Sequence, residues 1–524
     1  MLFQKNILVL IIFAASIYSP LNSYAFTTWN VLNKNGYKMH YTNTAKEYAL
    51  NLSADIENNF VRIKNFIGYK PDSCFDIYLV QKGYKWNIVN FFKVSGNGIK
   101  VYIDEDYNKS VNRIWEYSVD KTISMLYDKS SGLSVQKIRG YESWLSQTLA
   151  HYIIEGFSSE DDMILRSLIA RHITLPLSSD ATQQFSKTEI KALHLGLVYF
   201  ITESYGNNLM ISILNNISYC GGFIKSLEFI SGHNLETVEK DFNNFFESRY
   251  FEVLKNNDSI NKTKISDLNN SNILAVNQKG EILAYNNLTH NIDFLLSDSG
   301  SESMKLNIMA SIPFKAHRKN IIQGSFYNGN RVVITVTGEC GTHFYFYNIL
   351  NLSLQQKIFI PYVFLRELSG SHFHDGIVFS GSEGKRNGIF ILNTESMEIE
   401  KVTKGKGFYC FPAVLNNEKI IFVEKTDKRS VFKIDRKGEN MTLLWEPRNT
   451  VKDLAVSEKG DLYFSWNLDG IYNIYRFNIS EKKITQLTNY NTGAFNPLIY
   501  KNKKIIIKLY SERKYQKAVI SDDI

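Results

Sequence analysis

Histidine and carboxylate side chains are the residues of this chain whose spacing is suited to metal chemistry. His151 and Glu155 lie four residues apart, so both project from one face of a helix. Together with His172 or His194 they are candidate metal ligands, because a zinc site needs three or four converging donors. The alternative, which we favour, is that His151 and Glu155 form a partly exposed pair on a helix surface.

A second histidine pair has the spacing of neighbours on one face of a strand. His372 and His374 are separated by one residue, so a strand would place both on the same side. A lone pair is more often polar surface than a metal site. Other reaction patterns do not fit: Gly381-Ser-Glu-Gly384 is not a nucleophile elbow, no P-loop occurs, and Gly96-Asn-Gly98 is typical of a hairpin turn.

Four short segments follow one another in an order that is found in a family of zinc hydrolases. They are Asn97-Gly98-Ile99, Trp144–Tyr152, Tyr199–Gly206 and Gly232–Phe242. In this order and at this spacing they resemble a gluzincin-type, peptidase MA-like metallopeptidase over about residues 37–250. The resemblance implies an α+β, zincin-like domain that is mostly helical.

The resemblance also implies positions for the metal ligands, and the chain departs from the family at these positions. Active members carry HExxH on one helix, with two histidines that bind zinc and a glutamate that serves as general base. No HExxH occurs in this chain. When Ile114–Leu126 is aligned on its apolar positions, Tyr117, Ser118 and Lys121 occupy the three places. A lysine there would also repel a metal ion.

The third zinc ligand of the family is a glutamate in the helix that begins with the Trp-Leu-Ser sequence. This chain has Gln147 at that position, and a neutral amide is a poor zinc ligand compared with a carboxylate. The resemblance therefore implies a degenerate domain without catalytic residues, for which we expect no metal or other cofactor. His151 and Glu155 are the candidate residues of the remaining cleft.

The elements that position these residues are predicted from apolar spacing. A short strand at Tyr37–Tyr41 precedes a helix that Thr44 caps and that runs to about Phe66. Strands are predicted at Cys74–Val80 and Ile99–Ile103. Seven helices are then predicted at about 110–128, 141–155, 160–172, 187–205, 207–217, 221–230 and 235–250.

The chain changes character after the polar segment 255–263, which we interpret as a linker. Short strands then alternate with turns, and aromatic residues recur on strands that end near Asn or Asp. These aromatic residues are Phe294, Tyr345, Phe390, Phe432 and Tyr475. A period of about 43 residues with four short strands per unit predicts an all-β propeller of about six blades over residues 264–524.

One of these units is similar to a known propeller repeat. Asn473–Asn478, Ile484–Thr488 and Asn496–Ile499 resemble the bacterial TolB-like repeat, as does Phe390–Thr403. We expect the ring to close by pairing a C-terminal strand near Ala518–Ile520 with one near Lys264–Asp267, because closure removes exposed sheet edges.

The first 25 residues have the pattern of a secretory signal. Lys5 precedes an apolar stretch at Ile7–Ile17, and Ser23-Tyr24-Ala25 is a small-x-small cleavage site. No later stretch is long and apolar enough to span a membrane. The mature protein, from Phe26, is expected to be periplasmic or secreted, with residues 26–254 as its first domain.

Composition restricts the possible partners. The chain has 524 residues, 44% hydrophobic and 21% charged, with a net charge of +8 that is scattered rather than clustered. Nucleic-acid binding needs a clustered basic patch, so it is not expected. Two cysteine pairings would remain within the domains, Cys74 with Cys220 and Cys340 with Cys410, and four free buried thiols are the alternative.

Together these features predict an exported, non-catalytic binding or scaffold protein that binds a protein, peptide or other ligand of the cell envelope. Phe408, Tyr409 and Trp466 are candidate contacts in propeller loops, although packing within the blades is the favoured interpretation of these aromatic residues. The alternatives are an active metal-dependent hydrolase with unusual ligands and a structural component of an envelope complex.

Overall fold

A computed structural model of the chain describes residues 29–68, 75–80, 98–102, 107–131, 143–177, 181–255, 264–266, 271–277, 279–286, 288–289, 291–295, 303–306, 321–327, 330–338, 340–383, 386–405, 407–415, 418–425, 430–500, 504–511 and 513–522. The predicted signal segment and cleavage site lie outside these residues. So do Cys74, the Gly96-Asn97 turn and all of the predicted linker except its first residue.

The N-terminal sheet has the strand order β1-β2-β3-β4, with β1 antiparallel to β2 and the other pairs parallel. The strands are β1 (Asn30–Lys34), β2 (Tyr37–Tyr41), β3 (Phe75–Val80) and β4 (Gly98–Tyr102). Three of these strands confirm the predictions, whereas β1 was not predicted. Helix α2 (Lys46–Ile67) connects β2 to β3 and ends at Gly68, whose φ of 75° is the left-handed conformation that favours glycine.

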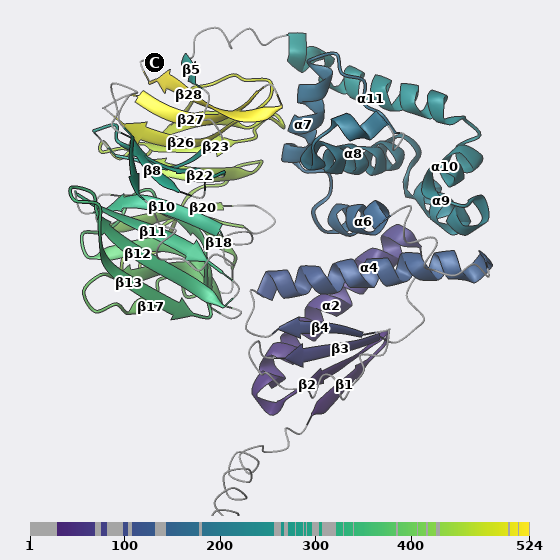
Figure 1. The fold of residues 1–524 in the computed structure, drawn as a ribbon, viewed down its shortest axis with the longest axis horizontal. Helices are drawn as coiled ribbons and strands as arrows, with labels where there is room; N and C mark the ends of the chain where they lie inside the picture. The colour runs from purple at the N-terminus through teal and green to yellow at the C-terminus, as the bar shows by residue number, and fades with distance from the viewer. Residues whose placement is uncertain are drawn as a thin grey trace, which may run out of the picture.

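All seven further helices predicted from the sequence are present; α8 has the predicted ends and each of the other six has at least one shifted end. They are α4 (Tyr107–Ser131), α6 (Ser143–Glu155), α7 (Ser159–Ile169), α8 (Lys187–Tyr205), α9 (Asn207–Cys220), α10 (Phe223–Ser231) and α11 (Leu235–Lys255). Short 3-10 turns lie at Asn43–Ala45 and Ala181–Gln184. In Figure 1, α4 and α2 lie against the sheet, and the helices from α6 onward form a second layer beyond α4.

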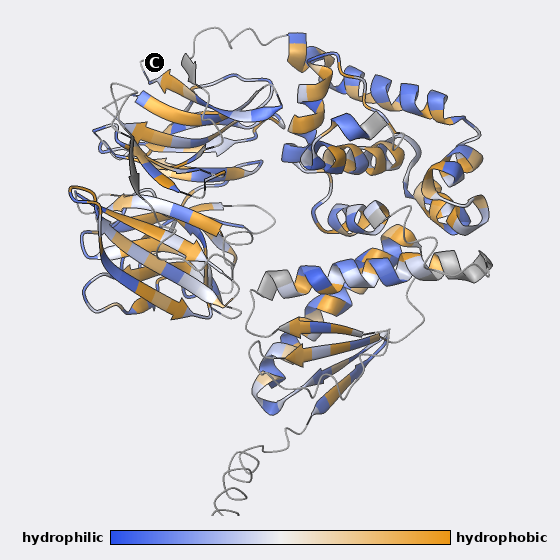
Figure 2. Cartoon of the chain, in the orientation of Figure 1, coloured by the Kyte–Doolittle hydropathy of each residue, from blue (hydrophilic) through white to orange (hydrophobic). Residues whose placement is uncertain are grey.

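Side chains at the helix starts explain two of the boundaries. Ser158 caps α7 by accepting a hydrogen bond from the Asp161 backbone N–H. Ser186 and Glu189 form a capping box at α8, in which each side chain accepts from the other residue's N–H. Hydrophobic residues repeat along the helices and strands (Figure 2) and build one continuous core through the sheet and the helical layers.

The C-terminal part is a six-bladed β-propeller, and each blade is a four-stranded antiparallel sheet. Its first three blades contain β6 (Ser271–Val276), β7 (Ile282–Asn286), β8 (Ile292–Leu295) and β9 (Ser303–Leu306); β10 (Ile321–Tyr327), β11 (Arg331–Thr337), β12 (Gly341–Asn348) and β13 (Ser353–Pro361); and β14 (Val363–Leu368), β15 (Gly376–Glu383), β16 (Arg386–Asn393) and β17 (Ile399–Lys401).

The remaining blades contain β18 (Tyr409–Leu415), β19 (Lys419–Glu424), β20 (Ser430–Asp435) and β21 (Thr442–Trp445); β22 (Val451–Val456), β23 (Leu462–Trp466), β24 (Asn473–Asn478) and β25 (Lys483–Gln486); and β26 (Ala494–Tyr500), β27 (Lys504–Ser511), β28 (Lys514–Ser521) and β5 (Lys264–Ser266). The sixth blade takes its outermost strand from the start of the domain. Ala518 of β28 pairs with Ile265 of β5, which confirms the predicted closure.

The repeat seen in the sequence corresponds to the third strand of each blade. The five recurring aromatic residues all lie on third strands: Phe294, Tyr345, Phe390, Phe432 and Tyr475. In blades two to five the strand ends at an Asn or Asp whose side chain accepts backbone N–H groups of the following turn: Asn348, Asn393, Asp435 and Asn478. Each of these turns then contains one non-glycine residue with positive φ: Leu352, Met397, Asn440 and Lys482. The sequence period is therefore a repeated turn geometry.

The proposed cysteine pairings are wrong, since the thiols of Cys220, Cys340 and Cys410 are not in disulfides. Cys340 is exposed in a turn of the second blade, whereas Cys410 is buried on the first strand of the fourth blade, so the two lie in different blades. The alternative of four buried thiols is also wrong for Cys340. Within the described parts of the chain, no helix has both the length and the apolar character needed to cross a membrane.

Candidate functional site

Helices α4 and α6 carry the positions at which the resemblance places metal ligands. The Tyr117 ring packs edge-on against Phe75 of the sheet, with ring centroids 5.3 Å apart. The Lys121 ammonium lies 5.5 Å from the centre of the Tyr117 ring. Ser118 is buried, and its hydroxyl donates to the backbone carbonyl of Ile114 at 2.7 Å. These three side chains thus take part in packing and in bonding within their own helix.

Helices α4 and α6 pack against each other. The Ser146 hydroxyl of α6 donates to the Asp120 carboxylate of α4 at 3.2 Å. Gln147, the next residue, is exposed. Because Ser118 is buried and Gln147 is exposed, these two predicted positions do not line one common surface.

His151 and Glu155 form the predicted pair on the surface of α6. The His151 Nε2 atom lies 3.6 Å from a Glu155 carboxylate oxygen and 3.9 Å from Asp161 of α7. Asp161 also accepts a 2.5 Å hydrogen bond from the Ser158 hydroxyl. Burial favours a higher pKa for Asp161, but hydrogen bonds from His151 and Ser158 outweigh this effect and lower its pKa. Asp161 was not predicted, although the capping serine three residues earlier is a usable signal.

The other two histidines of that proposed cluster have different environments. His172 is exposed just beyond α7 and has a positive φ of 56°. His194 stacks on Trp144 at 4.1 Å, and burial lowers its pKa to about 4. Among the residues that the structure describes, no group of three or more His, Cys, Asp or Glu side chains is arranged to hold a metal ion.

His372 and His374 also differ from each other. His372 accepts a hydrogen bond at Nδ1 from the Val378 backbone N–H at 3.1 Å, and burial lowers its pKa to about 3. His374 is exposed. Both residues lie in the loop between β14 and β15 rather than on a strand, so the alternation that would place them on one face does not apply.

The first strands of successive blades contact one another around a complete ring, so they line the propeller axis. Carboxylates on two of these strands accept hydrogen bonds from the backbone of the next blade. Asp453 accepts from the Ser465 hydroxyl at 2.9 Å and from the Asn496 N–H of the following blade at 3.1 Å. Glu367 accepts in the same way from Ser380 and from the backbone of Phe411. Burial raises the pKa of Glu367 despite these bonds.

The three predicted propeller contacts lie near the starts of first strands or the end of a second strand. Phe408 is half-buried between two cations, with Arg366 4.3 Å and Lys425 5.7 Å from its ring centre. Tyr409 and Trp466 are buried. The structure therefore leaves Phe408 as the most accessible of the three.

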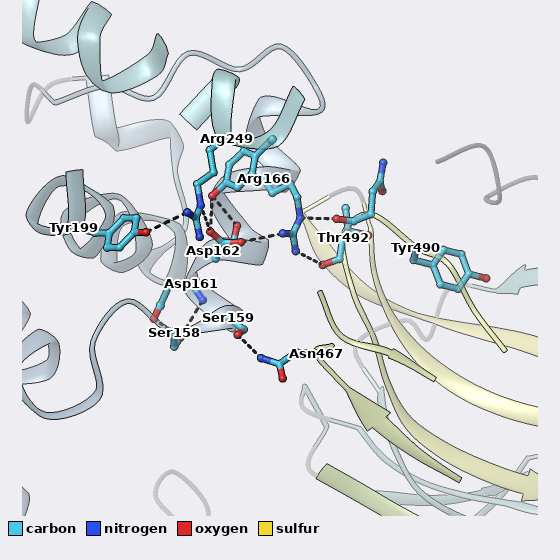
Figure 3. A network of polar contacts seen from close by, with 12 residues as sticks. Ser158, Ser159, Asp161, Asp162, Arg166, Tyr199, Arg249, Asn467, Tyr490 and Thr492 are labelled. Atoms are coloured by element: carbon cyan, nitrogen blue, oxygen red, sulfur yellow. Dashed lines mark hydrogen bonds and ion pairs between the residues drawn. The ribbon is translucent and has the colours of Figure 1, made fainter. Parts of the chain in front are cut away.

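A buried polar network joins the helical domain to the propeller (Figure 3). Arg166 of α7 is only 3% exposed and donates to Asp162 at 2.9 Å. Its Nε atom donates at 2.5 Å to the backbone carbonyl of Asn491, which lies 325 residues away in the propeller. Arg249 and Tyr250 of α11 also donate to Asp162, at 3.1 and 3.0 Å. The Arg166 guanidinium that bonds to the propeller is therefore positioned by Asp162 of α7, and Asp162 is in turn bonded by two residues of α11.

Further contacts surround this network. Ser159 accepts from the Asn467 amide at 2.7 Å, and Glu160 forms an ion pair with Lys452. At the start of α8, Glu189 accepts from Arg513 at 2.5 and 2.7 Å. Burial favours a higher pKa for Glu189, but the bonds from Arg513 and from the start of α8 lower it. Sequence analysis did not find this interface, because its partners are more than 290 residues apart.

Apolar packing at the interface explains why Asp161–Ile169 of α7 is buried on every side. Tyr472, Phe495 and Tyr510 of the propeller belong to the same hydrophobic core as the helical domain. Gly493 faces Met163 so closely that a Cβ atom there would lie 2.6 Å from the sulfur. Its φ of 148° also disfavours other residues. One face of α7 thus packs in its own domain and the other against the propeller.

No family model matches the chain. No curated protein sequence matches it significantly. Among solved structures the chain is similar to TolB from Acinetobacter baumannii, with 9% identity over 55% of this chain and 71% of that chain and a TM-score of 0.33. It is also similar to a putative TolB from Agrobacterium tumefaciens (13%, 39% and 72%, TM-score 0.31) and to a gluconolactonase from Xanthomonas campestris (9%, 50% and 91%, TM-score 0.37). At these values the similarities carry no argument about activity, and the propeller assignment rests on the strand pairings.

Proposed function

We propose that the protein is an exported, non-catalytic binding or scaffold protein. In this proposal residues 26–254 are a degenerate metallopeptidase-like domain, residues 264–524 are a TolB-like propeller, and the two domains present one surface to a protein or peptide ligand of the cell envelope. Export rests on the sequence pattern of the first 25 residues.

One observation carries the non-catalytic part of the proposal. The positions where the resembled family holds zinc and its general base are used here for packing. Tyr117 packs on Phe75, and Ser118 donates to a carbonyl of its own helix. A tyrosine and a buried serine whose proton is bonded within its own helix do not supply the imidazole ligands or the carboxylate base that the reaction of the resembled family uses.

The binding part of the proposal rests on the rigid joint between the domains. A guanidinium that is 3% exposed and contacts both domains favours one relative orientation of them. A fixed orientation lets one partner contact both domains without an entropic cost for ordering them. Phe408, which is half-buried between Arg366 and Lys425, is the contact that we assign to the propeller.

Metal analysis of the purified mature chain tests the first part. We expect no stoichiometric metal and no peptidase activity. The hydrolase alternative is favoured by the approach of Glu155 and Asp161 to His151. Stoichiometric zinc that disappears in His151→Ala, together with peptide hydrolysis that is lost in the same variant, would establish that alternative instead.

Affinity capture from the envelope fraction of the native host tests the second part. The native chain is compared with Phe408→Ala and with Phe251→Ala, a matched control because Phe251 is exposed on α11. We expect a partner that is retained by the control and lost by Phe408→Ala. Equal recovery by both variants would remove Phe408 from the binding surface, and the absence of any partner would contradict the scaffold role.

A further inference from the structure

Among the described residues, the outermost strand of the second blade, β13, is longer than the outermost strand of any other blade. It has nine residues, whereas β9, β17, β21, β25 and β5 have three or four. Within the described residues β13 pairs only with β12, so the backbone groups on its other edge have no strand partner. Long open edges are normally shortened, covered or charged, because they pair with other strands.

The side chains of β13 protect this edge only in part, because exposed apolar residues accompany Lys357 and Pro361, which disfavour pairing. Leu354 is 42% exposed and Phe359 is 45% exposed. The one charged residue of the strand, Lys357, leans over the ring of Tyr345 at 5.2 Å. Tyr362 continues the exposed apolar surface beyond the end of the strand. An edge of this length with exposed apolar side chains is suited to strand pairing rather than to solvent.

We propose that β13 pairs antiparallel with β13 of a second copy of this chain, across a two-fold axis that passes through Ile358. A strand added by an unrelated protein would only move the open edge outward. A second copy joins the two blades into one sheet without an open outer edge, and a two-fold axis makes the assembly closed.

The residue pattern selects this register. With Ile358 opposite itself, each Lys357 lies opposite Phe359 of the second copy, which is a favourable cation–aromatic pair. A two-fold through Lys357 would place two lysines opposite each other, and like charges directly opposite are destabilising.

The ends of the strand limit the ladder to Gln356–Ile360. The extra residue of a β-bulge lies between Leu354 and Gln356, and Pro361 at the other end has no N–H to donate. In the proposed register these two irregular positions lie opposite each other. The five regular residues therefore pair without interruption.

Sedimentation velocity of the full mature chain over a wide concentration range provides the first test. We expect a monomer–dimer equilibrium. Phe359→Lys should raise the dimer Kd about tenfold or more, because each dimer gains two like-charge pairs in place of two cation–aromatic pairs. The double variant Lys357→Glu with Phe359→Lys should restore the dimer, since opposite charges then face each other.

Cysteine cross-linking tests the register. Ile358→Cys should form a disulfide-linked dimer under mild oxidation, because directly opposite residues bring their Cα atoms within about 5.5 Å. Leu354→Cys on the same strand is the matched control and should not cross-link above the background of the native chain. A chain that remains monomeric overturns the proposal. So does a dimer that is unaffected by Phe359→Lys and not cross-linked through position 358. Thermal melting of each variant identifies any loss of folding.

Discussion

Replacement of Arg166 by methionine tests whether the two domains stabilise each other. The guanidinium is 3% exposed, donates to Asp162 at 2.9 Å and donates to the Asn491 carbonyl of the propeller at 2.5 Å. Removing one partner of a buried ion pair costs about 3–5 kcal/mol. Arg249 and Tyr250 would still donate to Asp162, so we expect the lower end, about 3 kcal/mol.

Differential scanning calorimetry measures this loss. A loss of about 3 kcal/mol corresponds to a fall in Tm of roughly 6–12 °C for a domain of this size. Because the lost contacts include the propeller, we also expect the helical domain and the propeller to unfold in separate transitions. Proteolysis between residues 255 and 263 should become faster in the variant, since the docked arrangement is populated less.

Arg249→Met is the matched control. Arg249 donates to the same carboxylate, but its side chain is 42% exposed and its bonds remain within the helical domain. Exposed ion pairs contribute about 0–1 kcal/mol, so this variant should lose no more than about 4 °C. If Arg166→Met melts within the range of Arg249→Met, the interface network does not couple the domains and the reasoning is refuted.

Three further predictions concern the domain interface, the closure of the propeller and a buried histidine. Because the pKa of Glu189 is lowered in the folded protein, its contribution to stability is present above its ordinary pKa of 4.5 and is lost as the pH falls through the lower folded value. The difference in Tm between the native chain and Glu189→Gln should therefore shrink below about pH 4.5. An unchanged difference would show that Arg513 does not hold this carboxylate ionised. Ala518→Pro removes an N–H from the strand that closes the propeller and should cost about 1–3 kcal/mol by chemical denaturation. Ser521→Pro at the strand end should cost less, and equal costs would contradict the closure. The pKa of His194 is lowered to about 4, so its imidazole signals in NMR should not titrate between pH 5 and 8. The stability of the fold should decrease as the pH drops from 6.5 towards 4, because the unfolded chain binds the proton first. Titration of His194 near pH 6.5 would refute its burial.

Local patterns predicted the elements of both domains well. The seven helices from α4 to α11 were all expected, because apolar residues at helical spacing and capping residues act within one turn. Ser186 and Glu189 form a capping box three residues apart. The missed strand β1 has alternating half-buried and exposed residues. Its pairing with β2 depends on a neighbour rather than on its own composition.

The candidate site was less predictable than the elements. The sequence correctly placed His151 and Glu155 on one helix face. It did not indicate that Asp161 approaches the same histidine from α7. It also could not distinguish Phe408, which is half-buried between two cations, from the buried Trp466. Exposure depends on which blade packs against a loop, and that is a property of the tertiary structure.

The number and order of the repeats can be inferred from local sequence alone. A period of about 43 residues arises because each blade repeats the same turn geometry. Residues close to one another in sequence form each turn, with Asn393 and Asn478 as examples. The hydrogen bond from Arg166 of α7 to Asn491 of a distant loop becomes evident only in the folded protein. Contacts of this kind join residues that share no local pattern, and they form only after both domains have positioned their surfaces. For the same reason, the open edge of β13 was evident only after its sheet was assembled.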